Sequence, residues 1–112
     1  MKKIEVIIRP ERLEIVRMAL EKVGYAGLMI TEIEGHGKQK GVVQQWRGEK
    51  YKVDFLPKVK IEIVIKDQEV EKITKAILDN AKTGEIGDGK IFISSIENAI
   101  RIRTGEKGEE AL

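Results

Sequence analysis

The chain has 112 residues, of which 41% are apolar and 36% are charged, and this composition suits one globular domain. It contains no cysteine, which excludes disulfides, thiolate metal sites and cysteine nucleophiles and fits a cytoplasmic protein. A net charge of +2 requires no polyanionic partner, and no apolar stretch approaches the roughly 20 residues that a membrane span needs.

The first part of the chain predicts a strand, a helix and a second strand. Residues 3–8 read KIEVII, a β-branched run typical of a strand. Apolar residues then recur every three or four positions, which predicts a helix with Pro10 at its start and Gly24 at its end. The recurring residues are Leu13, Val16, Leu20 and Val23. The second strand is predicted over about 28–33.

Residues 60–73, KIEIVIKDQEVEKI, nearly repeat residues 3–16, KIEVIIRPERLEIV, and therefore predict a duplicated unit. The second copy again predicts a strand and then a helix, with Asp67 as the helix N-cap. A last strand is predicted over 91–96. Two successive β-α-β units are typical of the ferredoxin-like split βαβ fold (βαββαβ), an α+β architecture with an antiparallel sheet and two helices on one face.

A long connection separates the two halves, between Glu34 and Pro57. It is rich in glycine, lysine and glutamine, and compact domains rarely keep so long a connection without a function. Two interpretations stay open: an extended β-hairpin with a polar tip, or a mobile effector loop over about 36–56.

The segment 82–90 is rich in glycine and contains the spacing Gly84-x-x-x-x-Gly89-Lys90, which superficially resembles a P-loop. The next residue is Ile91 rather than Ser or Thr, and the segment leads from a helix into a strand, so a Walker-type NTPase is not indicated. Glycines still allow backbone N–H groups to approach an anion closely, and the lysine adds a positive charge. The alternative is a tight turn with a solvated lysine.

Arg101 and Arg103 alternate with isoleucines near the C-terminus. In an extended segment both guanidinium groups face the same side, where they suit a polyphosphate, although a solvated strand face has the same pattern. The side-chain oxygen of Gln39 suits a hard cation such as Mg²⁺, and His36, the only histidine, has no second histidine or cysteine for a zinc site. The sequence contains no catalytic constellation, and Phe92 alone on the predicted strands does not suit RNA recognition.

Taken together, these motifs resemble the PII family of nitrogen-regulatory signal transduction proteins, closest to its ammonium-transporter-linked GlnK branch. The resemblance covers essentially the whole chain and implies a single PII-type domain over 1–112 with a C-terminal loop over about 102–112. The motifs that carry it are 83–92 (TGEIGDGKIF), 100–106 (IRIRTGE), 51–60 (YKVDFLPKVK) and the glycines and lysines of 35–41 (GHGKQKG).

The resemblance implies a homotrimer that binds ATP or ADP in three clefts between subunits, with 2-oxoglutarate and Mg²⁺ as further ligands. The residues that it assigns to the nucleotide are Ile7, Gly35, Gly37, Lys38, Gln39, Glu62, Val64, Gly87, Asp88, Gly89, Lys90, Arg101 and Arg103. For 2-oxoglutarate they are Gln39, Lys40, Gly41, Lys58 and Gly87, with Gln39 also the Mg²⁺ ligand. Met29 departs from the threonine that relatives often have near the adenine.

The same resemblance implies a non-enzymatic cytoplasmic regulator whose long loop enters a target such as an ammonium transporter, which would recruit the protein to the membrane. Arg47 and Trp46 are the expected partner contacts, and Tyr51 occupies the position that some relatives modify. Two other functions stay open. One is a slow ATPase or phosphotransferase that uses the glycine loop 84–90, and the other is a scaffold subunit without a ligand.

Overall fold

The computed structural model describes residues 1–35, 42–46, 49–53 and 56–112, and for 42–46 and 49–53 it describes the backbone alone. The described part of the chain contains two α-helices, a four-stranded sheet and a separate two-stranded sheet.

The first half of the chain forms the predicted strand, helix and strand. Strand β1 (Lys2–Ile8) leads through a 3₁₀ turn (Pro10–Arg12) into helix α1 (Leu13–Lys22), and β2 (Met29–Gly35) follows. Pro10 lies in the first turn, where a helix has no hydrogen-bond partner for a backbone N–H, so its missing N–H costs nothing.

Helix α1 ends at the predicted glycine. Gly24 has a φ of +100°, the left-handed conformation that glycine adopts most readily. The N–H of Tyr25 donates to the carbonyl of Leu20 at 2.9 Å and that of Gly24 to Glu21 at 3.0 Å. These two bonds satisfy the last carbonyls of the helix, which confirms the predicted end.

The second half repeats this order. Strand β5 (Leu56–Ile65) leads through a 3₁₀ turn (Asp67–Glu69) into helix α2 (Val70–Ala81), and β6 (Lys90–Ser95) follows. The prediction of Asp67 as the N-cap is wrong, because Lys66 occupies that position and makes no side-chain cap. The Asp67 carboxylate pairs instead with the ammonium group of Met1 at 2.9 Å, so the nearby chain terminus supplies a stronger donor than the helix amides.

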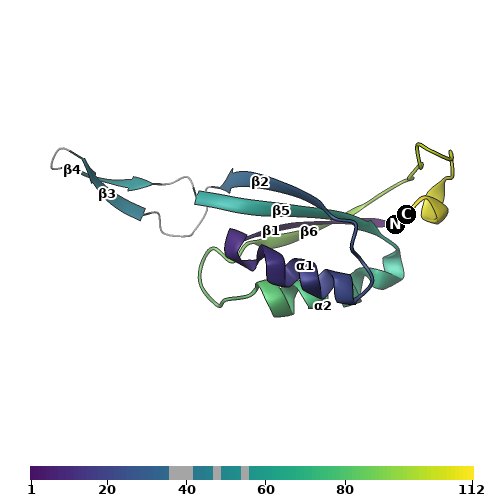
Figure 1. Ribbon diagram of the computed structural model, residues 1–112, viewed down its shortest axis with the longest axis horizontal. Helices are drawn as coiled ribbons and strands as arrows, with labels where there is room; N and C mark the ends of the chain where they lie inside the picture. The colour runs from purple at the N-terminus through teal and green to yellow at the C-terminus, as the bar shows by residue number, and fades with distance from the viewer. Residues whose placement is uncertain (36–41, 47–48, 54–55) are drawn as a thin grey trace.

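The four strands of the main sheet lie in the order β2-β5-β1-β6, and all neighbours are antiparallel. Figure 1 shows both helices against one face of this sheet, so the ferredoxin-like α+β prediction is confirmed. Alternate residues of the two central strands face the helices and form the core. The buried core residues are Ile4, Val6, Ile8, Val16, Leu20, Val59, Ile61, Ile63, Ile65, Ile73, Ile77 and Ala81.

Strand β5 begins earlier than the sequence repeat indicates, at Leu56. Its first residues pair with β2 alone, because β1 pairs with β5 only as far as Val59. Pro57 therefore lies where only one side of β5 has a neighbouring strand, and proline is tolerated there because it lacks just one N–H.

The long connection between β2 and β5 contains a hairpin of β3 (Val42–Trp46) and β4 (Glu49–Val53). The pairing runs from Val42 opposite Val53 to Trp46 opposite Glu49. Figure 1 shows this hairpin beyond the ends of β2 and β5, apart from the main sheet. An extended hairpin was one of the two interpretations of this segment, and its proposed motion stays a prediction.

Among the residues that the structure describes, no helix is long and apolar enough to cross a membrane.

Candidate ligand-binding site

The glycine-rich segment between α2 and β6 is the first part of the candidate site. Gly84, Gly87 and Gly89 have φ angles of +92°, +103° and +104°, in the region that other residues rarely adopt. The segment leads from α2 into β6, whereas a P-loop leads from a strand into a helix, which agrees with the sequence argument against a Walker-type P-loop.

The carboxylate of Asp88 braces this loop from the inside. It accepts hydrogen bonds from the N–H groups of Thr83 at 2.8 Å and Gly84 at 2.9 Å, and from the Thr83 hydroxyl. The Thr83 hydroxyl and these N–H groups, with a bond from Arg9, hold the pKa of the Asp88 carboxyl well below its usual value. These hydrogen bonds thus commit the side chain of Asp88 to the loop itself.

Arg9 and Lys58 attach the loop to the sheet. Arg9, which follows β1, donates from Nε to Asp88 Oδ1 at 3.1 Å and from Nη2 to the carbonyl of Ile86 at 2.8 Å. Lys58 on β5 donates from Nζ to the carbonyl of Gly87 at 2.6 Å. Burial lowers the pKa of the Lys58 ammonium, and the nearby charge of Arg9 lowers it further.

The loop presses closely against β1 at Gly89. A Cβ atom built on Gly89 would lie 1.6 Å from the carbonyl oxygen of Ile7 and 2.7 Å from its carbonyl carbon. Gly35, at the end of β2, is also crowded, because its Cβ would lie 3.2 Å from Cγ of Lys58. The predicted site residues brought together at this end of the sheet are Ile7, Gly35, Lys58, Gly87, Asp88, Gly89 and Lys90.

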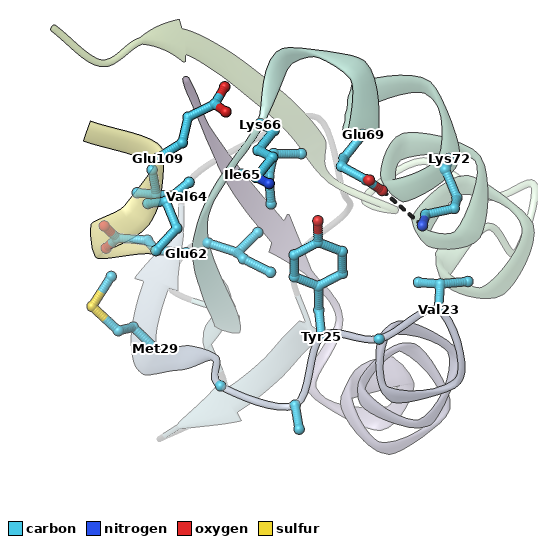
Figure 2. A pocket seen from close by; sticks show the side chains of 15 residues that line it. Val23, Tyr25, Met29, Glu62, Val64, Ile65, Lys66, Glu69, Lys72 and Glu109 are labelled. Atoms are coloured by element: carbon cyan, nitrogen blue, oxygen red, sulfur yellow. Dashed lines mark ion pairs between the residues drawn. The ribbon is translucent and has the colours of Figure 1, made fainter. Parts of the chain in front are cut away.

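The other predicted residues of β5 line an open depression of about 680 Å³. Figure 2 shows Glu62 and Val64 in its wall, together with Met29 from β2 and Glu109 from the C-terminal segment. The Glu62 carboxylate pairs with Lys3 at 3.1 Å and Lys60 at 3.2 Å, and these hydrogen bonds lower the pKa of the Glu62 carboxyl. The depression is therefore lined by both apolar and charged side chains.

Arg101 and Arg103 do not lie in the extended segment that the sequence suggested. Residues 102–104 form a turn, closed by the N–H of Gly105, which donates to the carbonyl of Arg101 at 2.7 Å. The Arg101 guanidinium pairs with Glu106 at 2.8 Å and donates to the carbonyls of Glu110 and Leu112 at 3.1 and 3.3 Å. The expectation of two guanidinium groups on one face of an extended segment is wrong, because the chain turns at residues 102–104 and the tail folds back to bond with the Arg101 guanidinium.

The structure does not bring all the predicted residues together in one chain. Figure 1 shows the loop before β6 near the hairpin end of the sheet and the C-terminal segment at the opposite end. Among the described residues, no three histidine or acidic side chains are grouped to hold a metal ion. Gly37, Lys38, Gln39, Lys40, Gly41 and Arg47 lie outside the described residues, as does His36, and for Trp46 and Tyr51 only the backbone is described.

Sequence reasoning did not single out Arg9 or Thr83 as site residues, although both contact Asp88. Arg9 is 79 residues from Asp88 in the chain, so no local motif joins them. The fold itself supplies a signal: β1 and β6 are neighbours, which places the residue after β1 beside the loop before β6.

Comparison with known proteins shows which sequences this chain resembles. The family model described as nitrogen regulatory protein P-II matches residues 1–106. Over 112 residues, the whole of both chains, the sequence is 59% identical to the nitrogen regulatory protein P-II of Bradyrhizobium diazoefficiens and 54% identical to that of Pasteurella multocida. It is 51% identical to nitrogen regulatory protein P-II 2 of Methanothermobacter thermautotrophicus, with all of this chain and 97% of that one covered.

The fold and the braced glycine loop thus define an α+β protein of the ferredoxin-like class. The chain belongs to the nitrogen regulatory protein P-II family.

The brace at Asp88 predicts a specific pH dependence of stability. We expect Asp88→Asn to lower the free energy of unfolding at pH 7 by about 1–3 kcal/mol, because it removes a hydrogen-bonded charge. The pKa of the Asp88 carboxyl is lowered by folding, so its contribution is complete above the unfolded value of about 4 and is lost as the pH falls below it. The gap between the wild type and the variant should therefore begin to narrow near about pH 5 and be smaller at about pH 3.

Urea denaturation of both proteins at a fixed protein concentration measures this gap. An equal gap at both ends of this acid range would contradict the role of the ionised carboxylate.

Proposed function

We propose that this chain is a non-enzymatic transducer of nitrogen, carbon and energy status that binds ATP or ADP and 2-oxoglutarate and regulates a target through its long loop. The observation that carries the proposal is the braced loop over 82–90. Its left-handed glycines, one of them packed against the Ile7 carbonyl, form a compact, side-chain-poor surface beside a lysine. Membership of the P-II family supports the regulatory class.

The chemistry of the loop fits a polyphosphate. Lys90 is exposed, and within the described part of the chain it makes no ion pair, so its ammonium group is available to an anion. The one carboxylate of the loop that points inward, Asp88, is neutralised by Arg9. We propose that Gly87, Asp88, Gly89 and Lys90 hold the phosphates, with Asp88 contributing through its backbone.

The separation of the predicted residues within one chain supports a homotrimer. Glu62 and Val64 line the depression beside Met29 and Glu109 instead of the phosphate loop of their own chain. The C-terminal segment, which carries Arg101 and Arg103, lies at the end of the sheet opposite that loop (Figure 1). A neighbouring subunit would place its Glu62 and Val64 against the adenine and its Arg101 and Arg103 against the phosphates. Ile7 and Gly35, with Gly37, Lys38 and Gln39 of the long loop, would complete the site from the first subunit.

We propose that Lys58 receives a carboxylate of 2-oxoglutarate. Its ammonium group is partly buried against the Gly87 carbonyl, and its Cγ lies beside Gly35, the last residue of β2 before the long loop. An acidic ligand there would stabilise the charged form of Lys58. Gln39, Lys40 and Gly41 would hold the rest of the keto acid. Gln39 would also hold Mg²⁺, which supplies an electrostatic link between phosphate oxygens and the keto acid.

The output would pass through the loop over about 36–56. The hairpin β3–β4 stands apart from the sheet and follows Gly35 along the chain, and Gly35 is one of the residues proposed to bind the nucleotide, so ligand binding can bias its position. We propose that it acts on a cytoplasmic face of a target such as an ammonium transporter, with Arg47 and Trp46 as contacts and Tyr51 as a modification site. A slow ATPase gains no support from the described residues, since the Asp88 carboxylate is committed to the loop rather than free to activate water.

Calorimetric titration with ATP in Mg²⁺, with and without 2-oxoglutarate, tests the proposal. We expect ATP binding that tightens when 2-oxoglutarate is present, and by linkage 2-oxoglutarate binding that tightens with ATP. Binding of ATP without this coupling would remove the proposed roles of Gln39 and Lys58. No ATP binding at all would overturn the proposal, and turnover at or above about one per second would indicate an enzyme instead.

A further inference from the structure

We propose that Arg9 is a positioning residue for the phosphate loop: it clamps the loop through Asp88 and the Ile86 carbonyl and does not itself touch the nucleotide. This inference rests on the proposed function, because it assigns a task to Arg9 in the same site. Because Arg9 would order the loop before any nucleotide binds, its role can also be tested in the unliganded protein.

The loop needs an external clamp because of its composition. Glycine loses more conformational freedom on ordering than any other residue, and this loop orders three of them in left-handed conformations. If that ordering occurred only on nucleotide binding, its cost would be subtracted from the affinity. A contact that orders the loop beforehand removes this cost from the binding step.

Arg9 is well placed to supply that contact because its backbone is rigid. It follows the buried residue Ile8 of β1 and precedes Pro10, which restricts the preceding residue to extended conformations. Its φ and ψ are −64° and 140°, within that region. The anchor of the clamp is therefore a central strand of the sheet.

The guanidinium group contacts two different parts of the loop. Its Nε bonds to the Asp88 carboxylate, which in turn accepts the N–H groups of Thr83 and Gly84 at the start of the loop. Its Nη2 bonds to the carbonyl of Ile86 at the tip. One planar fork thus connects both sides of the loop to β1, and the single ammonium group of a lysine cannot reproduce this geometry.

The same contacts argue against a direct contact between Arg9 and the nucleotide. The side chain of Arg9 is only 12% exposed, and the carboxylate 3.1 Å away compensates its charge. Among the described residues, Arg12 and Lys58 also contact the loop, but through the backbone carbonyls of Lys82 at 3.3 Å and Gly87 at 2.6 Å. Arg9 therefore acts through Asp88.

A double-mutant cycle separates the two roles. We would compare the ATP affinity of the wild type, Arg9→Gln, Asp88→Asn and the double variant by calorimetry, together with amide hydrogen exchange of residues 83–90 without nucleotide. We expect each single variant to bind ATP on the order of tenfold more weakly and to lose exchange protection in the loop. The ATP affinity of the double variant should be no lower than that of the single variant with the lower affinity, because the two residues act as one unit.

Additive losses would overturn the proposal, since they would show that Arg9 contributes independently of Asp88, as a direct phosphate contact does. Weaker binding with unchanged exchange in the unliganded loop would overturn it as well. Arg9→Lys, which keeps the charge, should behave like Arg9→Gln, and full recovery of affinity in Arg9→Lys would show that the charge alone matters.

Arg17→Gln is the matched control. It removes the same charge from a nearby helix, where Arg17 pairs with Glu14 and Glu21 and not with the loop, so affinity and loop exchange should stay at wild-type values. Failure of the wild type to bind ATP would refute the proposed function, whereas wild-type exchange in the loop of Arg9→Gln would refute the clamp.

Discussion

Replacing Gly89 with alanine is expected to lower the free energy of unfolding by about 3–5 kcal/mol and to abolish measurable ATP binding. The added Cβ would lie 1.6 Å from the carbonyl oxygen of Ile7, and the residue would keep a φ of +104° that alanine rarely adopts. The clash is with the backbone of β1, which pairs with a strand on each side and cannot move away. Urea denaturation at a fixed protein concentration and calorimetry with ATP measure the two effects.

Gly84→Ala is the matched control for this prediction. Gly84 has a similar φ of +92°, but nothing lies within 4 Å of an added Cβ. Alanine should therefore cost only the conformational strain, about 1–2 kcal/mol. Equal losses in the two variants would show that the left-handed conformation, and not the contact with Ile7, makes Gly89 necessary.

Replacing Arg103 with glutamate is expected to weaken ATP binding about a hundredfold while leaving the free energy of unfolding within about 0.5 kcal/mol of the wild type. Arg103 is exposed in the turn after Arg101, and among the described residues it makes no ion pair, so its removal should not disturb the fold. Reversal of its charge would both remove a phosphate contact and repel the phosphates. The measurements are calorimetry with ATP and urea denaturation.

Two further variants of the C-terminal segment serve as controls for Arg103→Glu. Lys107→Glu reverses an exposed charge outside the predicted site and should leave the affinity within about twofold of the wild type. Arg101→Glu should weaken both binding and stability, because it also breaks the pairs with Glu106 and the tail carbonyls. Unchanged ATP affinity in Arg103→Glu would remove the C-terminal segment from the proposed site and favour a scaffold without a ligand.

The internal repeat explains why the fold was predictable. Residues 3–16 and 60–73 carry the same alternation of apolar residues, and in the structure both copies form a strand, a 3₁₀ turn and a helix. Local patterns determine these elements because burial of one strand face and one helix face depends only on residue spacing. The end of α1 was also predictable, since a left-handed helix end strongly favours glycine at the position of Gly24.

The errors have a common cause, which is competition from a charged or hydrogen-bonding partner that the local pattern does not include. Asp67 was expected to cap a helix, but the ammonium group of Met1 lies beside it in the folded chain. Arg101 and Arg103 were expected to lie on one face of an extended segment, but Glu106 and the carbonyls of the tail bind the Arg101 guanidinium group. Propensity describes a residue and its neighbours in the chain, and a strong ionic partner outweighs it.

The candidate site likewise contains some residues that the sequence indicates and some contacts that only the tertiary structure shows. The glycines of 82–90, Lys90 and the two C-terminal arginines could be read from the sequence, because phosphate binding needs flexible backbone and positive charge and these are compositional features. Only the tertiary structure placed Arg9 and Lys58 against that loop, committed the Asp88 carboxylate to its interior and set Gly89 against Ile7. The contacts of Arg9, Lys58 and Gly89 join residues far apart in the chain, and they exist only because the order β2-β5-β1-β6 brings the strand ends side by side.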